Sequence, residues 1–302
     1  FNVQNQYFET LRASELEKVS RTEVERAQTI FDQTEEQVKV GKTAAKDVLQ
    51  AKADLANAKV TELQSRNTSA TDAATLKSLI GLPSGEPLPV LPAYPMPDTS
   101  LVPNDLNKVL ADGIANRPDL QAQRETIRSL QFTARSLSLQ AGLTVTLDAS
   151  FGASYSPNYN ENRFLTFTMT YPVFDGGASR AAARGANYNV RSAQQTLEQS
   201  ERDARAQIES AFVQLRQNVE RLAAAKDAYT AALENYNAAS ESQRLGASTI
   251  IDVLTANVSL VTAESNQIQA VYDYYISEVQ LKLATGAPLL GEPVGDRLPQ
   301  YK

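Results

Sequence analysis

The chain has 302 residues, a net charge of −6 and no histidine, cysteine or tryptophan. These absences exclude catalysis by histidine or cysteine, zinc sites built from thiolates or imidazoles, and disulfides. Its 29 basic residues are dispersed among 35 acidic ones, so we expect no nucleic-acid partner. We likewise expect no catalytic residues, no metal site and no cofactor.

The chain begins at Phe1 without an initiator methionine or a signal sequence, so we expect a processed or trimmed product whose export signal lies upstream. No stretch approaches the roughly 20 consecutive apolar residues of a membrane-spanning helix. A membrane role would therefore use strands.

Residues 2–80 have the pattern of a long helix with one interruption at Gly41. Seven of the 13 prolines then fall within the 21 residues 83–103, which can form neither a helix interior nor a central strand. This Pro-rich segment is predicted to be a stiff, extended connector. Beyond it, residues 104–140 are predicted to form one helix, capped by the Asn-Asp pair at its start.

The only strand-like pattern lies at about residues 143–174. Residues 144–151 and 165–173 alternate between an apolar and a hydroxyl-rich face, with a polar loop at 156–162 between them. Two such strands, flanked by tyrosines, match the pattern of transmembrane barrel strands. The residues predicted to face lipid are Val145, Leu147, Phe151, Leu165, Phe167, Met169 and Tyr171. The pattern alone also allows a soluble hairpin whose apolar face packs on a core.

A further helical region runs from about residue 178 to 245, breaks at Gly246 and resumes over 249–285. Its apolar residues recur in steps of 4, 3, 4, 3, 7, 4 and 3, with Lys226 at the position skipped in the step of 7. Counted with that position, the average step is 3.5, which is the period of a coiled-coil seam. A helix of about 68 residues would be ~100 Å long, which an ordinary globular domain does not contain. The seam comprises Ile208, Phe212, Leu215, Val219, Leu222, Tyr229, Leu233 and Tyr236.

An internal repeat relates the two halves of the chain. Shifting the sequence by 205 residues aligns Gly41 with Gly246 and places an Asp-Val-Leu segment after each glycine. We therefore predict two copies of one helical hairpin. The predicted division is a first repeat at 1–82, the connector at 83–103, a second repeat at 104–286 and a tail at 287–302.

Several short motifs occur in a specific order and spacing. They are NRPDL at 116–120, YPVFDGG at 171–177, and the Gly turns Val40-Gly41 and Leu245-Gly246, each followed by Asp-Val-Leu. Each motif is weak alone, but together they resemble the TolC-type outer-membrane efflux protein family over nearly the whole chain. The resemblance implies a homotrimer in the outer membrane of a Gram-negative-type bacterium, with most of each chain in the periplasm.

The fold class implied by the resemblance is mainly α with a small β part. Long coiled-coil helical hairpins would form a trimeric α-barrel tunnel, and strands would contribute to a trimeric transmembrane β-barrel. The implied function is the exit duct of a tripartite efflux or type I secretion system, for small molecules or proteins. The implied partners are two further copies of the chain, outer-membrane lipid, a periplasmic adaptor (membrane fusion) protein and an inner-membrane ABC or RND pump.

This chain holds only one of the two strand pairs that a family protomer gives to its barrel. The second repeat is complete, whereas the first lacks its opening helix and strand pair. We expect those elements to lie outside this sequence.

The two Gly turns are predicted to be the apices of helical hairpins, because glycine lets one helix end and an antiparallel one begin within a few residues. The resemblance implies that these tips dock the adaptor protein. The alternative is a pair of tight turns without a partner. The tip residues are Val40, Gly41, Lys42, Leu245, Gly246 and Ala247.

The resemblance also places Asp252 in an aspartate ring that narrows the tunnel entrance, and its repeat partner Asp47 in a polar network that holds the entrance shut. Carboxylates around a symmetry axis repel one another, which raises their pKa values and favours bound cations. Thr255 replaces the family's second acid, and Gln243 and Ser248 replace its Tyr and Arg. We therefore predict a constriction with a single acid. Alternatively, both carboxylates only complement the dipole of a first helical turn.

Three other classes of protein stay open. The chain could be a soluble coiled-coil scaffold whose hairpin is a structural cap, a periplasmic adaptor-like protein, or a hydrolase that uses paired carboxylates. An adaptor needs lipoyl-like and barrel domains with many short strands, which the sequence does not contain. A hydrolase needs a concave set of carboxylates, which the sequence does not suggest.

Overall fold

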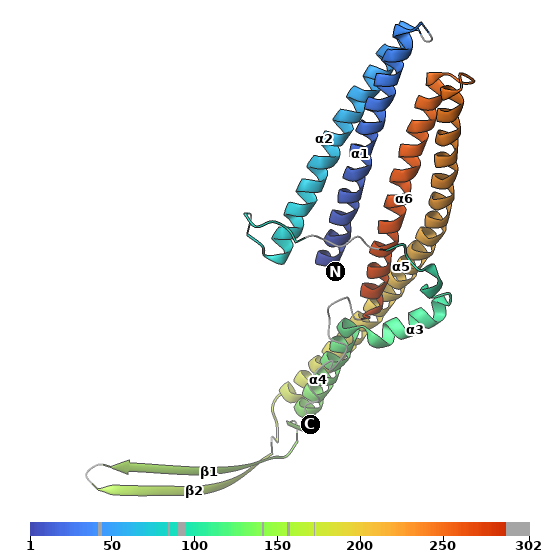
Figure 1. The fold of residues 1–302 in the computed structure, drawn as a ribbon. Coiled ribbons are helices and arrows are strands. Elements are labelled where there is room, and N and C mark those ends of the chain that lie inside the picture. The colour runs from blue at the N-terminus through green and yellow to red at the C-terminus, as the bar shows by residue number, and fades with distance from the viewer. Residues whose placement is uncertain are drawn as a thin grey trace. The chain divides into compact units, whose positions relative to one another are not determined.

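The computed structural model describes residues 1–41, 44–83, 85–89, 95–140, 142–155, 158–171 and 173–287. Its elements are α1 (Asn2–Lys39), α2 (Ala45–Ile80), the 3₁₀ helix η1 (Thr99–Leu101), α3 (Leu106–Asn116), α4 (Pro118–Gln140), β1 (Thr144–Tyr155), β2 (Tyr159–Thr170), α5 (Ala178–Arg244) and α6 (Ile250–Thr285) (Figure 1). They fall into two compact units, one made of residues 1–110 with those from 207 onward, the other of residues 111–206. None of the described helices is long and apolar enough to cross a membrane.

The predicted helical breaks at the glycines are confirmed. Gly41 and Gly246 end α1 and α5 with φ of 72° and 78°, and Gly81 and Gly286 end α2 and α6 with φ of 74° and 65°. A side chain would strain the backbone in this left-handed region, whereas glycine adopts it freely. Positions that correspond in the predicted repeat thus share one backbone conformation, which agrees with a duplicated hairpin.

In the first unit, α6 packs against both α1 and α5, and α2 packs along α1 (Figure 1). The seam predicted in α5 is buried along its first half, where Ile208 is 0% and Leu215 is 1% exposed. Nearer the tip, Tyr229, Leu233 and Tyr236 are half-buried. The period of 3.5 residues therefore marks a helix-packing face, as predicted.

The Pro-rich connector contacts α6 through one aromatic side chain. Tyr275 donates its hydroxyl to the carbonyl of Pro95 at 2.6 Å, and its ring stacks on Phe8 of α1 with centroids 5.3 Å apart. Apart from η1, the described residues of 83–103 form neither helix nor strand, as the prolines predicted.

The prediction of one helix over 104–140 is wrong, because the structure contains α3 and α4 with a break at Arg117. The side chain of Asp105 accepts a hydrogen bond from the Asn107 N–H at 2.9 Å and caps α3. Pro118 disfavours helical backbone at the preceding residue and has no N–H to donate, so α3 ends before it and α4 begins at it. Arg117 then pairs with Asp119 at 2.7 Å, which gives the NRPDL motif a structural role.

In the second unit, α4 packs on the first part of α5. Ala134, Ala186 and Val190 form the buried contact. Beside it, Arg124 pairs with Glu201 at 2.8 Å. Small residues at this contact allow the two helices to approach closely.

The YPVFDGG motif caps the start of α5. The carboxylate of Asp175 accepts the backbone N–H of Gly177 at 2.9 Å and that of Ser179 at 2.8 Å. A hydrogen bond from the Ser179 side chain, together with these two backbone bonds, lowers the pKa of Asp175 to about 2. The motif therefore fixes where the longest helix begins.

The two strands pair antiparallel, with Thr144 opposite Thr170 and Leu147 opposite Phe167. This register places the predicted apolar residues of both strands on one face, as expected. The predicted loop at 156–162 ends too late, because β2 begins at Tyr159; residues 156 and 157 lie outside the described residues. Residues 160–163 are all polar or charged, and Glu161 and Arg163 stand on the apolar face, so alternation did not indicate a strand there. Tyr171 lies just beyond the strand.

Candidate functional site

The two helical tips expose large apolar side chains. Val40 precedes Gly41 and is 67% exposed, and Leu245 precedes Gly246 and is 69% exposed. Ala247 follows the second glycine and is also exposed. Lys42, which we predicted to belong to the first tip, lies outside the described residues. Each tip therefore presents one exposed apolar side chain beside a glycine turn.

Asp252 is held in a capping box at the start of α6. Its Oδ2 accepts hydrogen bonds from the backbone N–H and the hydroxyl of Thr249, both at 2.8 Å, and the Thr249 hydroxyl accepts the Asp252 N–H. The bonds from Thr249 lower the pKa of Asp252 below its ordinary value. Within one chain, Asp252 is thus an exposed, ionised carboxylate of fixed orientation. The alternative interpretation, in which Asp252 only complements the dipole of the first turn of α6, also explains these contacts.

Asp47 occupies the corresponding place in α2 without the same cap. It lies in the first turn of α2, but the residue at the N-cap is Ala44, which has no side-chain oxygen to accept the Asp47 N–H. In both repeats the backbone N–H of the acid donates to the carbonyl of the N-cap residue, at 2.9 Å for Asp47 and 3.2 Å for Asp252, so the difference lies in the side chains. The two repeats therefore share the position of the acid but not the capping box.

Of the three polar residues predicted beside the acids, one forms a hydrogen bond between two helices. Gln243 of α5 donates its Nε2 to Oε1 of Gln37 in α1 at 3.0 Å. Thr255 donates to the Ile251 carbonyl within α6 at 2.8 Å, and Ser248 donates to a backbone carbonyl of α5. The Gln37–Gln243 bond connects α1 to α5 a few residues before each Gly turn.

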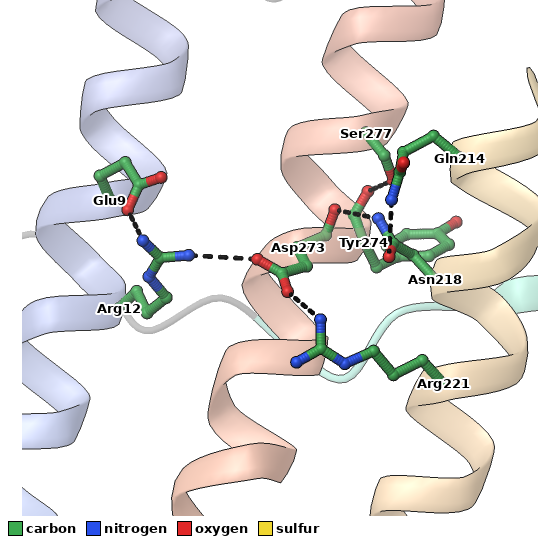
Figure 2. A network of polar contacts seen from close by, with 8 residues as sticks. All are labelled: Glu9, Arg12, Gln214, Asn218, Arg221, Asp273, Tyr274 and Ser277. Carbon is green, nitrogen blue, oxygen red and sulfur yellow. Dashed lines mark hydrogen bonds and ion pairs between the residues drawn. The ribbon is translucent and has the colours of Figure 1, made fainter. Parts of the chain in front are cut away.

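Sequence reasoning missed a charged cluster centred on Asp273 in α6 (Figure 2). Arg12 of α1 donates to Oδ1 of Asp273 at 3.1 Å, and Arg221 of α5 donates to Oδ2 at 2.8 Å. Figure 2 shows the two guanidinium groups reaching the carboxylate from opposite sides. A single carboxylate therefore joins three helices.

Further hydrogen bonds surround this cluster. The buried Asn218 of α5 donates its Nδ2 to the Asp273 carbonyl at 3.0 Å. Glu9 accepts a hydrogen bond from Arg12, and burial raises the pKa of Glu9, while the charge of Arg12 opposes that rise. The repeat could not have revealed the cluster, because Thr68 stands where the shift would place a partner of Asp273.

Comparison with known proteins gives one family. The family model described as Outer membrane efflux protein matches residues 1–82 and 109–287. The outer membrane protein TolC of Escherichia coli (strain K12) is 24% identical in an alignment of 302 positions. The alignment covers 94% of this chain and 60% of TolC. The outer membrane efflux protein BepC of Brucella suis is 24% identical over 270 residues, which cover 87% of this chain and 57% of BepC. The chain thus spans about three fifths of the length of these relatives.

Solved structures share the fold. The outer-membrane channel OprN superposes with a TM-score of 0.76 at 21% identity, over 95% of this chain and 65% of that chain. The Neisseria gonorrhoeae MtrE outer membrane channel, in its open state, gives a TM-score of 0.74 at 19% identity, over 95% of this chain and 65% of that one. The fold class is therefore mainly α with a small β part, as the sequence predicted.

The capping box predicts opposite effects of two substitutions at corresponding positions. Thr249→Ala removes the hydroxyl that accepts the Asp252 N–H, so amides in the first turn of α6 should exchange with solvent roughly fivefold faster. Ala44→Thr supplies the missing acceptor beside Asp47, so amides at the start of α2 should exchange more slowly. Hydrogen exchange followed by mass spectrometry measures both.

The effect of Thr249→Ala should depend on pH. The pKa of Asp252 is lowered on folding, so its contribution is present above the unfolded value and lost as pH falls through the folded value. The difference between the variant and the parent should therefore shrink at acid pH to the part that comes from the Thr249 hydroxyl as acceptor of the Asp252 N–H. Equal exchange at neutral pH would contradict the role of the box.

Proposed function

This chain belongs to the outer membrane efflux protein family, and on that premise we propose that three copies of it form an outer-membrane channel-tunnel. The tunnel serves as the exit duct of a tripartite efflux or type I secretion system and carries small molecules or proteins to the exterior. Its work is passive and not enzymatic. The observation that carries the proposal is a pair of unpartnered coiled-coil seams on the two outer helices of the wall.

The first unpartnered seam lies on α2. Its residues recur in alternating steps of 4 and 3, yet all of them are exposed. Val60 is 53%, Leu63 57% and Leu49 68% exposed. The residues of this α2 seam are Leu49, Ala53, Ala56, Val60 and Leu63. Such a face is expected to pack against another helix, and in the described residues none covers it.

The second unpartnered seam lies on α5, opposite the face that packs on α6. Its residues also recur in steps of 4 and 3, are exposed, and are mostly alanine. The residues of this α5 seam are Ala224, Ala228, Ala231, Asn235 and Ala238. Small side chains on one helix accept larger ones from its neighbour, so the Leu and Val side chains of the α2 seam suit the α5 seam.

The positions of the seams favour a closed ring of copies. Within the first unit α1 and α6 are the inner helices, so the α2 seam and the α5 seam lie on the two outer ones (Figure 1). An interface between two different surfaces of one chain repeats from copy to copy and closes a ring when the rotation permits. Three copies would supply twelve helices to the wall of such a tunnel.

The strand pair supports a membrane location. Its apolar face is unburied: Leu147 is 63%, Phe167 62% and Leu165 73% exposed. No described residue covers this face, which disfavours the soluble hairpin on a core and the scaffold whose hairpin is a cap. A two-stranded hairpin is at best marginally stable alone, so it needs other strands and an apolar surrounding.

The dimensions of the strand pair also suit a bilayer. Each strand has 12 residues, which at about 3.3 Å per residue and a tilt near 45° span roughly 28 Å, close to the height of a barrel's apolar band. Tyr155 and Tyr171 lie at opposite ends, where aromatic girdles are expected. Glu161 and Arg163 are the exceptions on the apolar face, and they pair with each other at 2.8 Å. The guanidinium of Arg163 lies 5.4 Å from the centre of the Phe151 ring.

The remaining roles follow the same premise. The exposed apolar tips at Val40 and Leu245 dock a periplasmic adaptor protein, which links the duct to an inner-membrane ABC or RND pump. The two hairpins are copies of one repeat, and Asp252 gives a ring of three carboxylates at the tunnel entrance. Relatives named for efflux and for alkaline protease secretion agree with either class of cargo.

Disulfide cross-linking tests the pairing of the α2 seam with the α5 seam. These 302 residues contain no cysteine. Val60 lies 15 residues after Ala45 and Ala228 lies 16 residues before Arg244, so they are at nearly one level from the tips. After oxidation, the double variant Val60→Cys with Ala228→Cys should give a ladder that stops at three chains, whereas either single variant should not.

The two residues of a control pair lie level with each other but off both seams, five to six residues farther from the tips than the first pair. Arg66 and Ala223 are exposed and lie 21 residues from the same two helix ends. The double variant Arg66→Cys with Ala223→Cys should therefore cross-link much more slowly. Equal cross-linking by both pairs, or only intramolecular bonds, would argue against the proposed interface.

Conductance tests the proposed acid at the entrance. Asp252→Asn keeps an oxygen that accepts both hydrogen bonds from Thr249 but removes the charge, so the channel should lose cation selectivity and block by divalent cations. Thr249→Ala keeps the charge and should retain both properties. Unchanged selectivity in Asp252→Asn would eliminate the single-acid constriction.

A further inference from the structure

A second cluster of charged residues lies where α1, α2 and α6 meet, away from the tips and from Asp273. A groove of about 490 Å³ runs between these helices. Glu23 of α1, Asp54 of α2 and Asn257 of α6 line it. Asn257 is 3% exposed, so its amide lies among the buried residues of the bundle. Nothing in the proposed duct function uses this cluster.

The contacts in the cluster leave three buried polar atoms without a hydrogen-bond partner. Asn257 donates its Nδ2 to Oε1 of Glu23 at 2.8 Å, and Arg26 donates to Glu264 at 3.0 Å. Oε2 of Glu23, Oδ1 of Asn257 and Nη1 of Arg26 are buried and have no hydrogen-bond partner among the described residues. Two of the three are acceptors on side chains that already contact each other.

Turning the Asn257 amide over does not satisfy these atoms. An ionised carboxylate only accepts, so Asn257 must present its N–H to Glu23, which leaves the amide oxygen unpaired. A buried acceptor without a donor is costly. One proton on Glu23 satisfies both acceptors, because a carboxylic acid and an amide form a closed ring of two reciprocal hydrogen bonds.

We propose that Glu23 is a proton-binding site that joins α1 to α6. In the protonated form Glu23 donates an Oε2–H bond to Oδ1 of Asn257, while Asn257 still donates to Oε1. Two hydrogen bonds then connect the helices in place of one. The step is a proton uptake from solvent and forms no covalent bond between residues.

The surrounding charges favour the proton. The carboxylates of Glu264 and Asp54 repel a charge on Glu23, and the guanidinium of Arg26 attracts it, so protonation removes part of a surplus of negative charge. Burial raises the pKa of Glu23; the Asn257 bond and the Arg26 charge oppose the rise, and Glu264 and Asp54 add to it. Both unpaired acceptors are shielded from solvent, and a proton, unlike a hydrated cation, needs no additional volume there.

The contact between α1 and α6 should therefore strengthen as pH falls. Glutamate titrates near 4.5 in the unfolded chain, and folding raises the Glu23 value above this. The stability gained by protonation is fully present below the unfolded value and is lost as pH rises through the folded one. Each pH unit between the two values changes the unfolding equilibrium constant about tenfold. This inference depends only on α1 and α6, and it goes beyond the proposed duct function.

The titration of Glu23 tests the proposal directly. Infrared difference spectra of the full-length protein in detergent, recorded against pH, should show a protonated-carboxyl band with a midpoint above 4.5 that is absent in Glu23→Gln. Glutamine can form the reciprocal pair with Asn257 at every pH. In the parent the midpoint temperature of thermal unfolding should therefore decrease as pH rises above 4.5, and in Glu23→Gln it should stay level.

Glu25→Gln is the matched control, because Glu25 is exposed on the same helix and should leave the parent's pH dependence unchanged. The competing arrangement is an ionised Glu23 that turns to Nη1 of Arg26, 4.0 Å from Oε2. In that case Glu23 would titrate at or below 4.5, and Glu23→Gln would destabilise the protein at neutral pH. Either result overturns the proposal.

Discussion

The packing of α6 between α1 and α5 is the contact on which the first unit depends. Each of these helices has 36 residues or more, and its apolar side chains are buried only where it packs against a neighbouring helix. Asp273 marks the centre of this contact, because its carboxylate pairs with Arg12 on one side and Arg221 on the other. All three side chains are partly exposed, so solvent screening keeps the energy of each pair small. The cluster therefore sets the register of the three helices more than it stabilises them.

The same packing leaves one apolar face exposed on each outer helix, α2 and α5. These exposed faces link the fold to the proposed function. A helix in the interior of a wall needs two packing faces, and α2 and α5 each carry a second heptad pattern with nothing described against it. One chain therefore forms a segment of a helical wall. One edge of the segment carries the Leu and Val side chains of the α2 seam, and the other carries the alanines of the α5 seam. The apolar face of the strand pair, around Leu147 and Phe167, is also exposed and is expected to contact an apolar environment. Both surfaces are explained if copies of the chain assemble and the strands meet lipid.

Local patterns in the sequence predicted most of the fold. The heptad period predicted the buried face of α5, the glycines predicted the helix ends, and alternation predicted the facing residues of the strands. The break at Pro118 was missed because helical periodicity continues across it, although the proline itself signals a boundary. Residues 159–162 were missed as strand because alternation stops there: Glu161 stands on the apolar face, where the pattern requires an apolar residue. A local signal was therefore present at Pro118 but not at the start of β2.

The candidate sites were less predictable, since they depend on contacts between distant segments. The capping box is visible in the spacing of Thr249 and Asp252, and sequence reasoning missed it. Neither the Asp273 cluster nor the Glu23–Asn257 pair leaves a local signal, because their partners lie on helices more than 50 residues apart. Only tertiary packing brings these groups together.

The claim that one chain is an incomplete wall is tested most directly by the native mass of the full-length protein, released from detergent micelles without any substitution. The account predicts a particle of three chains, because the α2 seam and the α5 seam of each copy must both be covered. A stable particle of one chain would show that the seams need no partner and would contradict the account.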